Sequence, residues 1–405
     1  MGRAVFIFRN DLRTHDNTAY TQAINDGYTV VPIYFLSKKS KNKHASAFLQ
    51  KALKTIDVTV YEDADEISVL KKLKCDAVYF NEEYGLSLHS KVGSATAAAT
   101  KIKNFCKKQN IPCVTAEDYG LLPLMQGLVD DERPYKVFSQ FYKKVMTLDI
   151  RKPEKDIELK QLIPLKHYED ERNFPALNNT SRLSADLQFG LISVREFYWA
   201  IVKLFGKDHG LIRQLIFRDF YLKMYALTDP LSPIDKHIPW SYDKTLFAKW
   251  KKGLTGYPFV DAGMRELNET GFQHNRLRML CGSVLTKYFL IDWRWGMKYY
   301  EDVLTDANVF SNTAGWGFVS STGVDAVPYF RRPFNPFIQS KKFDKDAEYI
   351  KKWVPELQDV EPKDIHKWYD PAVREKYSIK YPEPAIDHEF ASKRAVEVFT
   401  KAYKK

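Results

Sequence analysis

Residues 4–8, 17–26 and 29–36 read AVFIF, NTAYTQAIND and TVVPIYFL, and this opening stretch decides the fold of the first part of the chain. The first and third segments are short, apolar and rich in β-branched and aromatic residues, which is typical of buried strands. The middle segment is amphipathic with helical spacing. A strand, a helix and a second strand in this order indicate a βαβ unit, whose two strands run parallel.

The same alternation continues to about residue 115 and predicts an open, doubly wound parallel sheet. Ligands of such folds bind beyond the carboxyl ends of the strands, here near residues 9–17 and 81–85. This half has neither a GxGxxG fingerprint nor a Walker loop, so it carries no nucleotide-binding motif. The remaining expected strands and helices are Val58–Tyr61, Ala77–Phe80 and Ile111–Val114, and Lys43–Lys54, Glu66–Lys72 and Lys91–Gln109.

The pattern changes after a polar, proline-containing stretch from Lys152 to Tyr168, which we interpret as part of an interdomain connector. All eight tryptophans lie beyond residue 198, where the apolar residues follow helical spacing. We therefore expect an α/β domain at residues 1–125, a connector at 126–170 and a larger helical domain at 171–405. Its helical stretches are Val194–Leu204, Ile212–Ala226, Tyr257–Thr270, Leu277–Phe289, Lys298–Leu304 and Asp346–Val354.

The composition excludes several classes of protein. Aromatic residues make up 14% of the 405 residues, which supplies apolar surface to bury and disfavours disorder. No apolar run approaches the roughly 18 residues of a membrane span. The four cysteines show no C-x-x-C spacing and the nine histidines no HExxH motif. We therefore expect free thiols in a reducing, intracellular compartment and no metal held by the protein.

Positive charge is concentrated in one quarter of the chain. The formal net charge is +11, and residues 201–300 hold 16 lysines and arginines against 9 acidic residues. A solvated basic face is the commoner cause of such a surplus. The alternative is a surface for a polyanion, most simply nucleic acid, and composition cannot choose between the two.

Two segments combine small, hydroxyl and aromatic residues at high density. Residues 168–184 read YEDERNFPALNNTSRLS, and hydroxyls and N–H groups at a helix start can hold phosphate, although an ordinary N-cap is the commoner cause. Residues 306–331 place glycines and serines around Trp316 and Phe318. That pattern suits either a close backbone approach to a flat ligand or a tight helix crossing.

A third segment, residues 272–279 (FQHNRLRM), contains two arginines. Arg276 and Arg278 are two positions apart, so on a helix they point to different faces. One of them can pair internally while the other faces a ligand.

Together these motifs resemble the photolyase/cryptochrome family, most of all the class I cyclobutane pyrimidine dimer (CPD) DNA photolyases. The resemblance covers nearly the whole chain, in the order VFIFRNDLRTHDN, RPYKVFSQFYKK, FPALNNTSRLS, QLIFRDFY, KGLTGYPFVDAGMRELNETGFQHNRLRM, LIDWRWG, AGWGFVSSTGVDAVPYFR and FNPFIQSKKFD. It implies an N-terminal α/β domain followed by a larger helical domain that binds FAD and DNA. It also implies light-driven electron transfer from reduced FAD to a flipped-out dimer, which splits into two pyrimidines.

The resemblance also implies which residues hold FAD. Arg278 would pair with Asp306 beside the flavin, and Asn312 falls close to flavin N5. A neutral amide at that place suits a photolyase, whereas plant-type photoreceptors tend to have an acid there. The full set assigned to the cofactor is Tyr168, Thr180, Ser181, Arg182, Leu183, Ser184, Gln214, Arg218, Arg278, Asp306, Ala307, Asn308 and Asn312.

Trp240, Trp293 and Trp316 match the family's chain of electron donors to the flavin. Their separations in sequence are wide, so the fold must assemble any such chain. Without the resemblance, burial in a core is the better interpretation of all three indoles.

On the DNA side, Asn275 and Met279 match the lesion pocket of dimer photolyases, and (6-4) photolyases have histidines at both positions. The other residues assigned to DNA are Arg172, Gln214, Phe217, Arg276, Phe318, Arg331 and Gln339. The expected partner is UV-damaged DNA, double- or single-stranded, bound by a monomer in the cytoplasm or nucleus.

Three departures weaken the match. Gln214 stands where dimer photolyases usually have a glutamic acid, and Phe217 and Phe318 stand where two tryptophans usually hold the dimer. Phenylalanine keeps a stacking face, with a loss on the order of 1 kcal/mol each. The alternatives are a cryptochrome-type photoreceptor with little repair, a (6-4) photolyase, and a DNA-binding protein that has lost FAD.

Family members often bind an antenna pigment, a folate or a deazaflavin, in the N-terminal domain. Asn81, Glu82 and Glu83 lie where such contacts are common, yet carboxylates at a strand end are ordinary surface features. The domain is short between Phe35 and Asn81, so the sequence does not predict that this second chromophore binds.

Overall fold

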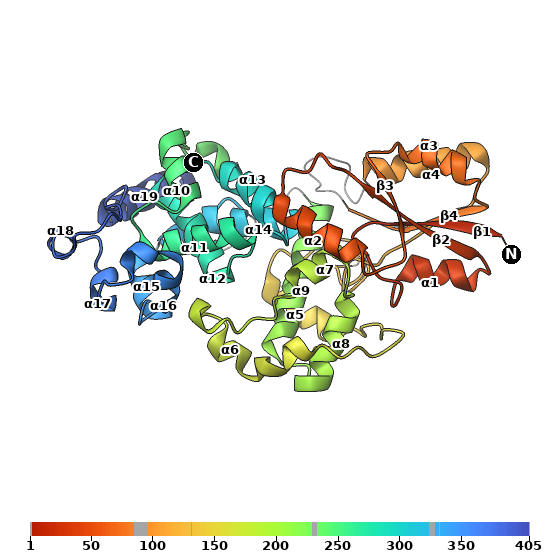
Figure 1. The fold of residues 1–405 in the computed structure, drawn as a ribbon, viewed down its shortest axis with the longest axis horizontal. Helices are drawn as coiled ribbons and strands as arrows, with labels where there is room; N and C mark the ends of the chain where they lie inside the picture. Colours follow the sequence, from red (N-terminus) through yellow and green to blue (C-terminus); the bar gives the residue numbers. More distant parts are fainter. Residues whose placement is uncertain are drawn as a thin grey trace. The chain divides into compact units, whose positions relative to one another are not determined.

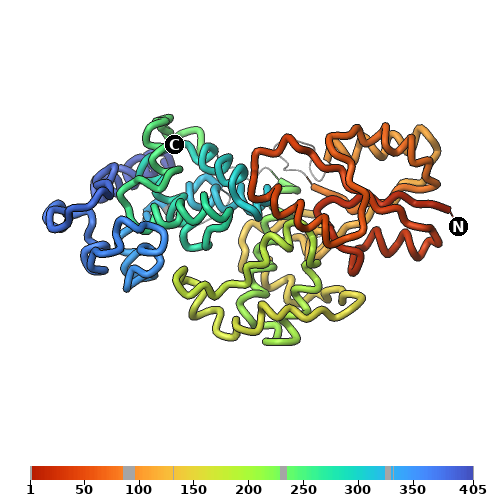
Figure 2. The backbone as a smooth tube through the Cα atoms, viewed as in Figure 1, coloured from red at the N-terminus to blue at the C-terminus, as the bar shows by residue number. Residues whose placement is uncertain are grey.

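The computed structural model describes residues 2–84, 96–130, 132–228, 233–323, 329–331 and 333–404. Backbone contacts divide the chain into two compact units, each treated by itself. The first unit comprises residues 1–166 and 181–229, and the second comprises residues 167–180 and 230–405 (Figures 1 and 2). This grouping differs from the predicted domains at 1–125 and 171–405. Those domains rest on the change in sequence pattern, and they stay a prediction.

The first unit contains a sheet of the strands β1 (Arg3–Phe8), β2 (Thr29–Leu36), β3 (Thr59–Glu62), β4 (Ala77–Asn81) and β5 (Cys113–Ala116). The strand order is β3-β2-β1-β4-β5, and every neighbouring pair is parallel. The order reverses between β1 and β4, as in a doubly wound sheet. The predicted α/β fold of this part is confirmed.

Helices cover both faces of this sheet, namely α1 (Thr18–Asn25), α2 (Lys43–Leu53), α3 (Glu66–Leu73) and α4 (Ala97–Gln109) (Figure 1). Alternate residues of β1 enter different cores, because side chains of a strand alternate between faces. Val5 and Ile7 are buried in a cluster with α3 and α4, whereas Ala4, Phe6 and Phe8 are buried in a cluster with α1 and α2.

Two predicted boundaries in this unit differ from the structure. The strand predicted at Ile111–Val114 is observed at Cys113–Ala116. Pro112 explains the later start, since proline has no N–H for the ladder. The helix predicted from Lys91 begins at Ala97 after an N-cap at Thr96, whose hydroxyl accepts from the Ala99 N–H; residues 91–95 lie outside the described residues.

The rest of the first unit is helical, with α5 (Phe138–Val145), α7 (Ser184–Phe189), α8 (Val194–Phe205) and α9 (Gly210–Leu227). The sequence predicts α8 and α9 and misses α5. Ser193 begins α8 with a capping box, in which its hydroxyl and the Glu196 carboxylate satisfy each other's backbone N–H groups.

The second unit consists of helices and turns, as predicted. Its helices are α6 (Tyr168–Glu171), α10 (Lys244–Lys252), α11 (Pro258–Thr270), α12 (Asn275–Ser283), α13 (Trp293–Val303), α14 (Val309–Ser320), α15 (Pro336–Phe343), α16 (Glu348–Trp353), α17 (Pro362–Ile365), α18 (Pro371–Arg374) and α19 (His388–Tyr403). No helix among the described residues is long and apolar enough to cross a membrane.

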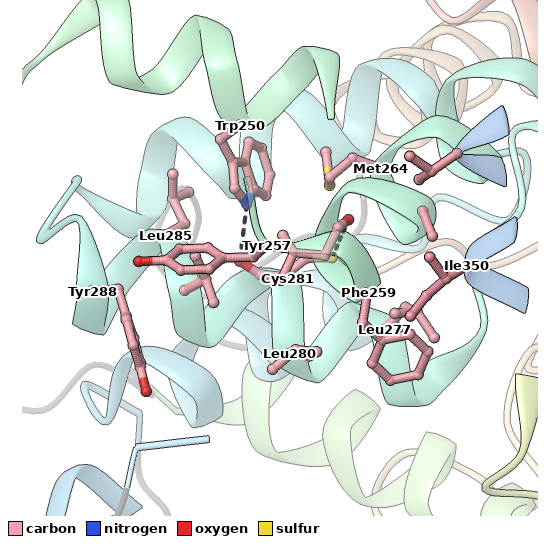
Figure 3. Packing of buried hydrophobic residues seen from close by; sticks show 14 of the residues in the cluster. Trp250, Tyr257, Phe259, Met264, Leu277, Leu280, Cys281, Leu285, Tyr288 and Ile350 are labelled. Atoms are coloured by element: carbon pink, nitrogen blue, oxygen red, sulfur yellow. Dashed lines mark hydrogen bonds between the residues drawn. The ribbon is translucent and has the colours of Figure 1, made fainter. Parts of the chain in front are cut away.

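One hydrophobic core holds the second unit together (Figure 3). Trp250, Tyr257, Leu277 and Tyr288 are fully buried in it. The Trp250 indole Nε1–H donates to the Cys281 backbone oxygen at 2.9 Å, so the largest buried side chain leaves no polar atom unsatisfied.

Helix boundaries in this unit also differ from the predictions. The helix predicted at Leu277–Phe289 is α12 followed by a π-helical turn, η5 (Val284–Tyr288). The helix predicted from Lys298 begins five residues earlier, at Trp293, because the Asp292 side chain caps it at the Arg294 N–H. The predicted set lacks α10, α14, α15 and α19, together with the short helices α6, α17 and α18.

Candidate active site

Helix α14 runs through the glycine-rich segment, and Asn308 caps it by accepting the Ser311 N–H at 2.9 Å. One face is buried and contains Trp316. The opposite face is only half-buried. Its members are Asn308, Ser311, Asn312, Gly315 and Phe318, spaced three or four residues apart as one stripe of a helix. We call these five residues the α14 stripe.

Two glycines show how differently the two sides of α14 are filled. A Cβ atom on Gly315, in the α14 stripe, would meet no heavy atom of the described residues within 4 Å, apart from the backbone of its own helix. A Cβ atom on Gly296 of α13 would lie 2.1 Å from the Trp316 ring. One side of α14 therefore crosses α13 tightly at Gly296, which agrees with the helix-crossing interpretation. The other side leaves space at Gly315, where contact with a flat ligand stays a prediction.

An ion pair lies at the start of the α14 stripe. Arg278 of α12 donates from Nη2 to both carboxylate oxygens of Asp306, at 3.0 and 2.9 Å. Its Nε also donates to the Gln273 backbone oxygen at 2.8 Å, which fixes the guanidinium. The predicted pair is confirmed, and Arg278 is the internally paired arginine of α12. Ala307 and Asn308 follow Asp306 directly, so these three residues, all assigned to the cofactor, lead into the α14 stripe.

The Asn312 side chain is held in one orientation. Its amide Nδ2–H donates to the Met297 backbone oxygen of α13 at 3.0 Å. Because the nitrogen is used in this way, the amide oxygen is directed elsewhere. The predicted neutral group is thus held in place on the half-buried face of α14.

Arg276 lies on a different face of α12 from Arg278, as predicted. Its guanidinium lies 4.2 Å from the centre of the Phe343 ring and donates to Asn173 Oδ1 at 2.5 Å. Its Nε is buried with no partner among the described residues. Burial and the nearby Arg172 guanidinium lower the pKa of Arg276, which indicates a place that would gain from an anion.

The two predicted lesion-pocket residues of α12 contact each other. Asn275 is exposed, and its Nδ2 lies 3.7 Å from the Met279 sulfur, one helical turn later. Three further residues assigned to DNA also lie in the second unit. Arg172 lies 5.4 Å from the centre of the Tyr168 ring, Arg331 is exposed in a 3-10 turn, and Gln339 is half-buried on α15.

The three predicted electron donors also lie in the second unit. Trp316 and Trp293 are buried, at 3% and 2% exposed, and Trp240 is half-buried. The Nε1–H groups of Trp240 and Trp293 donate to the same oxygen, Oδ1 of Asp235, at 3.2 and 2.9 Å. Sequence reasoning missed Asp235, and no motif around it could have indicated this role.

The remaining residues assigned to the cofactor are divided between the units. Tyr168 and Thr180 belong to the second unit, and burial raises the pKa of the Tyr168 hydroxyl. Arg182 has a positive φ of 55°, a conformation that costs a non-glycine residue energy and is common at functional sites. The residues in the first unit are Ser181, Arg182, Leu183, Ser184, Gln214 and Arg218, and their contact with FAD stays a prediction.

Phe217 and Arg218 of α9 already have partners within the first unit. The Phe217 ring stacks on Phe138 of α5 with a centroid distance of 3.3 Å and an angle of 6° between planes. Arg218 donates from Nη1 to the Tyr119 backbone oxygen at 2.8 Å. Gln214 lies one turn before Phe217 and is half-buried. One face of the predicted stacking ring is therefore covered.

A second polar cluster occupies the predicted ligand edge of the sheet, where β1 and β4 end. Arg9 donates to Glu83 at 2.6 Å, and Asn81 donates to Asp11 at 2.6 Å. Burial raises the pKa of Asp11 to about 6. The cavity among these residues, which Arg218 also lines, has a volume of about 30 Å³, enough for only a few water molecules.

Comparison with known proteins agrees with this arrangement. Residues 4–158 match the family described as DNA photolyase, and residues 211–401 match the FAD binding domain of DNA photolyase. A deoxyribodipyrimidine photo-lyase from Alkalihalophilus pseudofirmus is 32% identical, over 97% of this chain and 96% of the relative.

Two solved structures cover the chain throughout. A bacterial class III photolyase from Agrobacterium tumefaciens superimposes with a TM-score of 0.89 and 27% identity, over 100% of this chain and 98% of that one. An archaeal photolyase from Sulfolobus tokodaii, solved with two FAD molecules, gives 0.83 and 30% identity, over 99% of each chain.

The chain combines a doubly wound parallel sheet with a helical unit, and the solved photolyases share this fold. The chain belongs to the DNA photolyase family. It contains the family's FAD-binding domain, and FAD is its cofactor. The second unit fits such a group, since Gly315 leaves space for a flat ring and Arg278, Asp306 and Asn312 supply fixed polar groups beside it.

Proposed function

We propose that this protein is a light-driven DNA repair enzyme, a deoxyribodipyrimidine photo-lyase that splits cyclobutane pyrimidine dimers. The observation that carries the proposal is the α14 stripe, half-buried and open at Gly315, with the Arg278–Asp306 pair at its start. When bound, FAD supplies the light absorption and the electron that the reaction needs. The protein orients the reactants, stabilises the negative charge near Arg278 and excludes water.

The Arg278–Asp306 pair and the Asn312 amide suit a flavin that must remain reduced. In the proposal, the guanidinium of Arg278 stabilises negative charge nearby, while Asp306 fixes its position. A buried or half-buried pair of this kind chiefly sets geometry and local potential, because desolvation offsets much of the Coulomb attraction. The Asn312 amide adds a neutral polar group, which neither repels nor neutralises that charge.

The lesion side of the proposal rests on α12. Asn275 and Met279 present an amide and an apolar sulfur one turn apart, which suits a flipped-out pyrimidine pair with polar edges and apolar faces. Arg172, Arg276 and Arg331 are assigned to DNA phosphates, with Gln339 as a polar contact. Phosphate contacts fix the position of the duplex, and the weakened pairing at a damaged site makes flipping cheaper.

A cryptochrome-type photoreceptor is the second candidate, and one observation favours it. Phe217, which the resemblance places against the lesion, is stacked on Phe138 and has one face covered. Gln214 and Phe318 depart from the family pattern in the same direction. We expect these three substitutions to weaken lesion binding, to slow repair or to shift the preference toward single-stranded DNA.

The proposal also covers the oligomeric state and the cellular compartment of the protein. We infer a monomer in an intracellular, reducing compartment, and the four cysteines are all free. A second antenna chromophore is not part of the proposal, because the sequence does not predict that it binds. The class I subtype stays a prediction, because one of the similar solved structures is a class III photolyase.

A repair assay tests the proposal. Chemically reduced, FAD-loaded protein is illuminated with blue light in the presence of oligonucleotides that contain either a cyclobutane thymine dimer or a (6-4) photoproduct. Light-dependent repair of the first substrate alone is expected, with no change in the dark. Repair of the (6-4) substrate would reassign the specificity, and repair of neither by a yellow protein would favour the photoreceptor.

A further inference from the structure

Asp235 links two of the tryptophans through one atom. It lies in the 3-10 turn η4 (Pro233–His237), five residues before Trp240 and far in sequence from Trp293. Its Oδ1 accepts the Nε1–H of Trp240 at 3.2 Å and that of Trp293 at 2.9 Å. The two indole nitrogens therefore cannot be farther apart than these two bonds placed end to end.

The cluster around Asp235 carries excess negative charge. Arg294 pairs with Asp235 and also with Asp292, at 3.1 Å to Oδ1. Two carboxylates and one guanidinium leave one net negative charge in this cluster. The Arg294 guanidinium also lies 4.8 Å from the centre of the Trp293 ring, so it offsets part of the carboxylate's effect on that indole.

Trp250 provides an internal contrast. It is fully buried and close to Trp316, with ring centroids 6.2 Å apart. Its Nε1–H donates to a neutral acceptor, the Cys281 backbone oxygen (Figure 3). Trp240 and Trp293 thus differ from this equally well-bonded indole in having a carboxylate as acceptor. Hydrogen bonds to charged acceptors are about twice as strong as neutral ones.

We propose that Asp235 is a positioning residue of the electron-donor chain, which holds Trp240 and Trp293 together and stabilises positive charge on them. The inference rests on the proposed role of the three tryptophans. An electron that Trp316 gives to photoexcited FAD is replaced by one from Trp293, and that one by one from Trp240. The oxidised indole keeps its N–H proton, shared with Asp235, and becomes a radical cation.

The consequence is a one-way bias along the chain. No contact joins Asp235 to Trp316 among those described, so its charge favours the cation on the distal pair over the cation on Trp316. A unit charge at hydrogen-bond distance outweighs the stabilisation that a neutral amide gives. Charge separated in the light therefore lasts longer before it recombines.

The experiment is flash photolysis of the full-length protein loaded with oxidised FAD, with the tryptophan radical followed by its absorbance. We expect Asp235→Asn, which keeps an acceptor oxygen but loses the charge, to shorten the lifetime of the separated charge at least about tenfold. Asp235→Glu, which keeps the negative charge, should retain most of the wild-type lifetime. Asp292→Asn is the comparison variant: it removes a carboxylate of the same cluster that accepts from no indole in the described structure, so we expect a smaller loss of lifetime than with Asp235→Asn.

A second readout is independent of photochemistry. In the same protein with ¹⁵N-labelled indoles, Asp235→Asn should shift two of the eight indole N–H signals in the dark, and it should shift them more than Asp292→Asn does. Shifted signals with an unchanged lifetime would overturn the electrostatic role and leave Asp235 as packing only. Unshifted signals in a folded variant would contradict the shared hydrogen bond itself.

Trp240→Phe separates this inference from the proposed function. If Trp240→Phe leaves photoreduction at the wild-type rate, the donor chain is wrong and Asp235 loses its role with it. If Trp240→Phe slows photoreduction and Asp235→Asn behaves as wild type, the chain stands and the role of Asp235 is refuted.

Discussion

The sheet edge of the first unit and the α14 stripe of the second unit both gather charged and amide side chains, yet they are built in opposite ways. At the sheet edge most charges are paired with one another, as in the bridge of Asp118 to Arg13 and Arg195, and only a few guanidinium nitrogens of Arg9 and Arg13 lack a partner among the described residues. Along α14 the polar groups are half-buried and Gly315 opens onto free space. Charges that pair mainly with one another stabilise the fold, whereas polar groups on a half-buried helix face can also contact a ligand.

The largest effect expected from this comparison is on stability in the first unit. Asp118→Asn leaves Arg13 and Arg195 buried without their shared carboxylate, which accepts from Arg195 at 2.7 Å. Breaking a buried charge network by removing one partner costs about 3–5 kcal/mol. Urea denaturation should show a loss of that size, and a loss below about 1 kcal/mol would mean that the network is not structural.

The second prediction fills the space beside α14. Gly315→Leu places its Cβ where no atom of the described residues outside the helix backbone lies within 4 Å, and it replaces a poor helix former, so the flavin-free protein should be no less stable. FAD affinity should fall at least about tenfold, a loss of about 1.4 kcal/mol, because the side chain takes the place of the ring. Equilibrium titration of flavin-free protein with FAD measures it.

Gly296→Ala is the matched control on the other side of α14. Its Cβ would meet the Trp316 ring at 2.1 Å, so it should lower the melting temperature. Equal FAD affinity in Gly315→Leu and wild-type protein would show that the flavin lies elsewhere.

A smaller effect concerns DNA. Arg276→Ala should weaken binding to damaged oligonucleotides by about 1 kcal/mol or more and reduce the slope of log affinity against log salt by about 1. Arg133→Ala, which removes an exposed arginine paired with Asp130 in the first unit, should change neither. An unchanged salt slope in Arg276→Ala would remove this residue from the DNA surface.

The smallest effect is a dependence on pH. The guanidinium groups of Arg13 and Arg195 and the hydroxyl of Thr18 hold the pKa of Asp118 well below its usual value, although burial opposes them. The stabilisation is therefore complete at neutral pH and is lost as the pH falls below the unfolded value of about 4. Asp118→Asn should flatten this acid-side loss in denaturation curves taken at several pH values. An unchanged slope would assign the loss to other carboxylates.

The sheet could be predicted from the sequence because its signal is local. Strands such as Ala77–Phe80 are short apolar runs between amphipathic stretches, and the order of elements sets the topology within narrow rules. The start of the last strand at Cys113 depends on Pro112. The missing N–H of this proline can be read from the sequence, but the register of the strand cannot.

The site was predicted through a resemblance more than through physical patterning. The Arg278–Asp306 pair joins residues 28 positions apart, and helical spacing could say only that Arg276 and Arg278 diverge. The role of Gly315 depends on which side of α14 is packed, which only the tertiary structure reveals. Asp235 was missed for the same reason, since its two partners come together only when α13 packs beside η4.

A crystal structure of the FAD-loaded protein tests the central claim most directly. The account predicts the isoalloxazine ring in van der Waals contact with Gly315 and Asn312, with the Arg278–Asp306 pair beside it. A ring bound away from Gly315, above all one bound at the sheet edge of the first unit among Arg9, Asp11 and Asn81, would contradict the account.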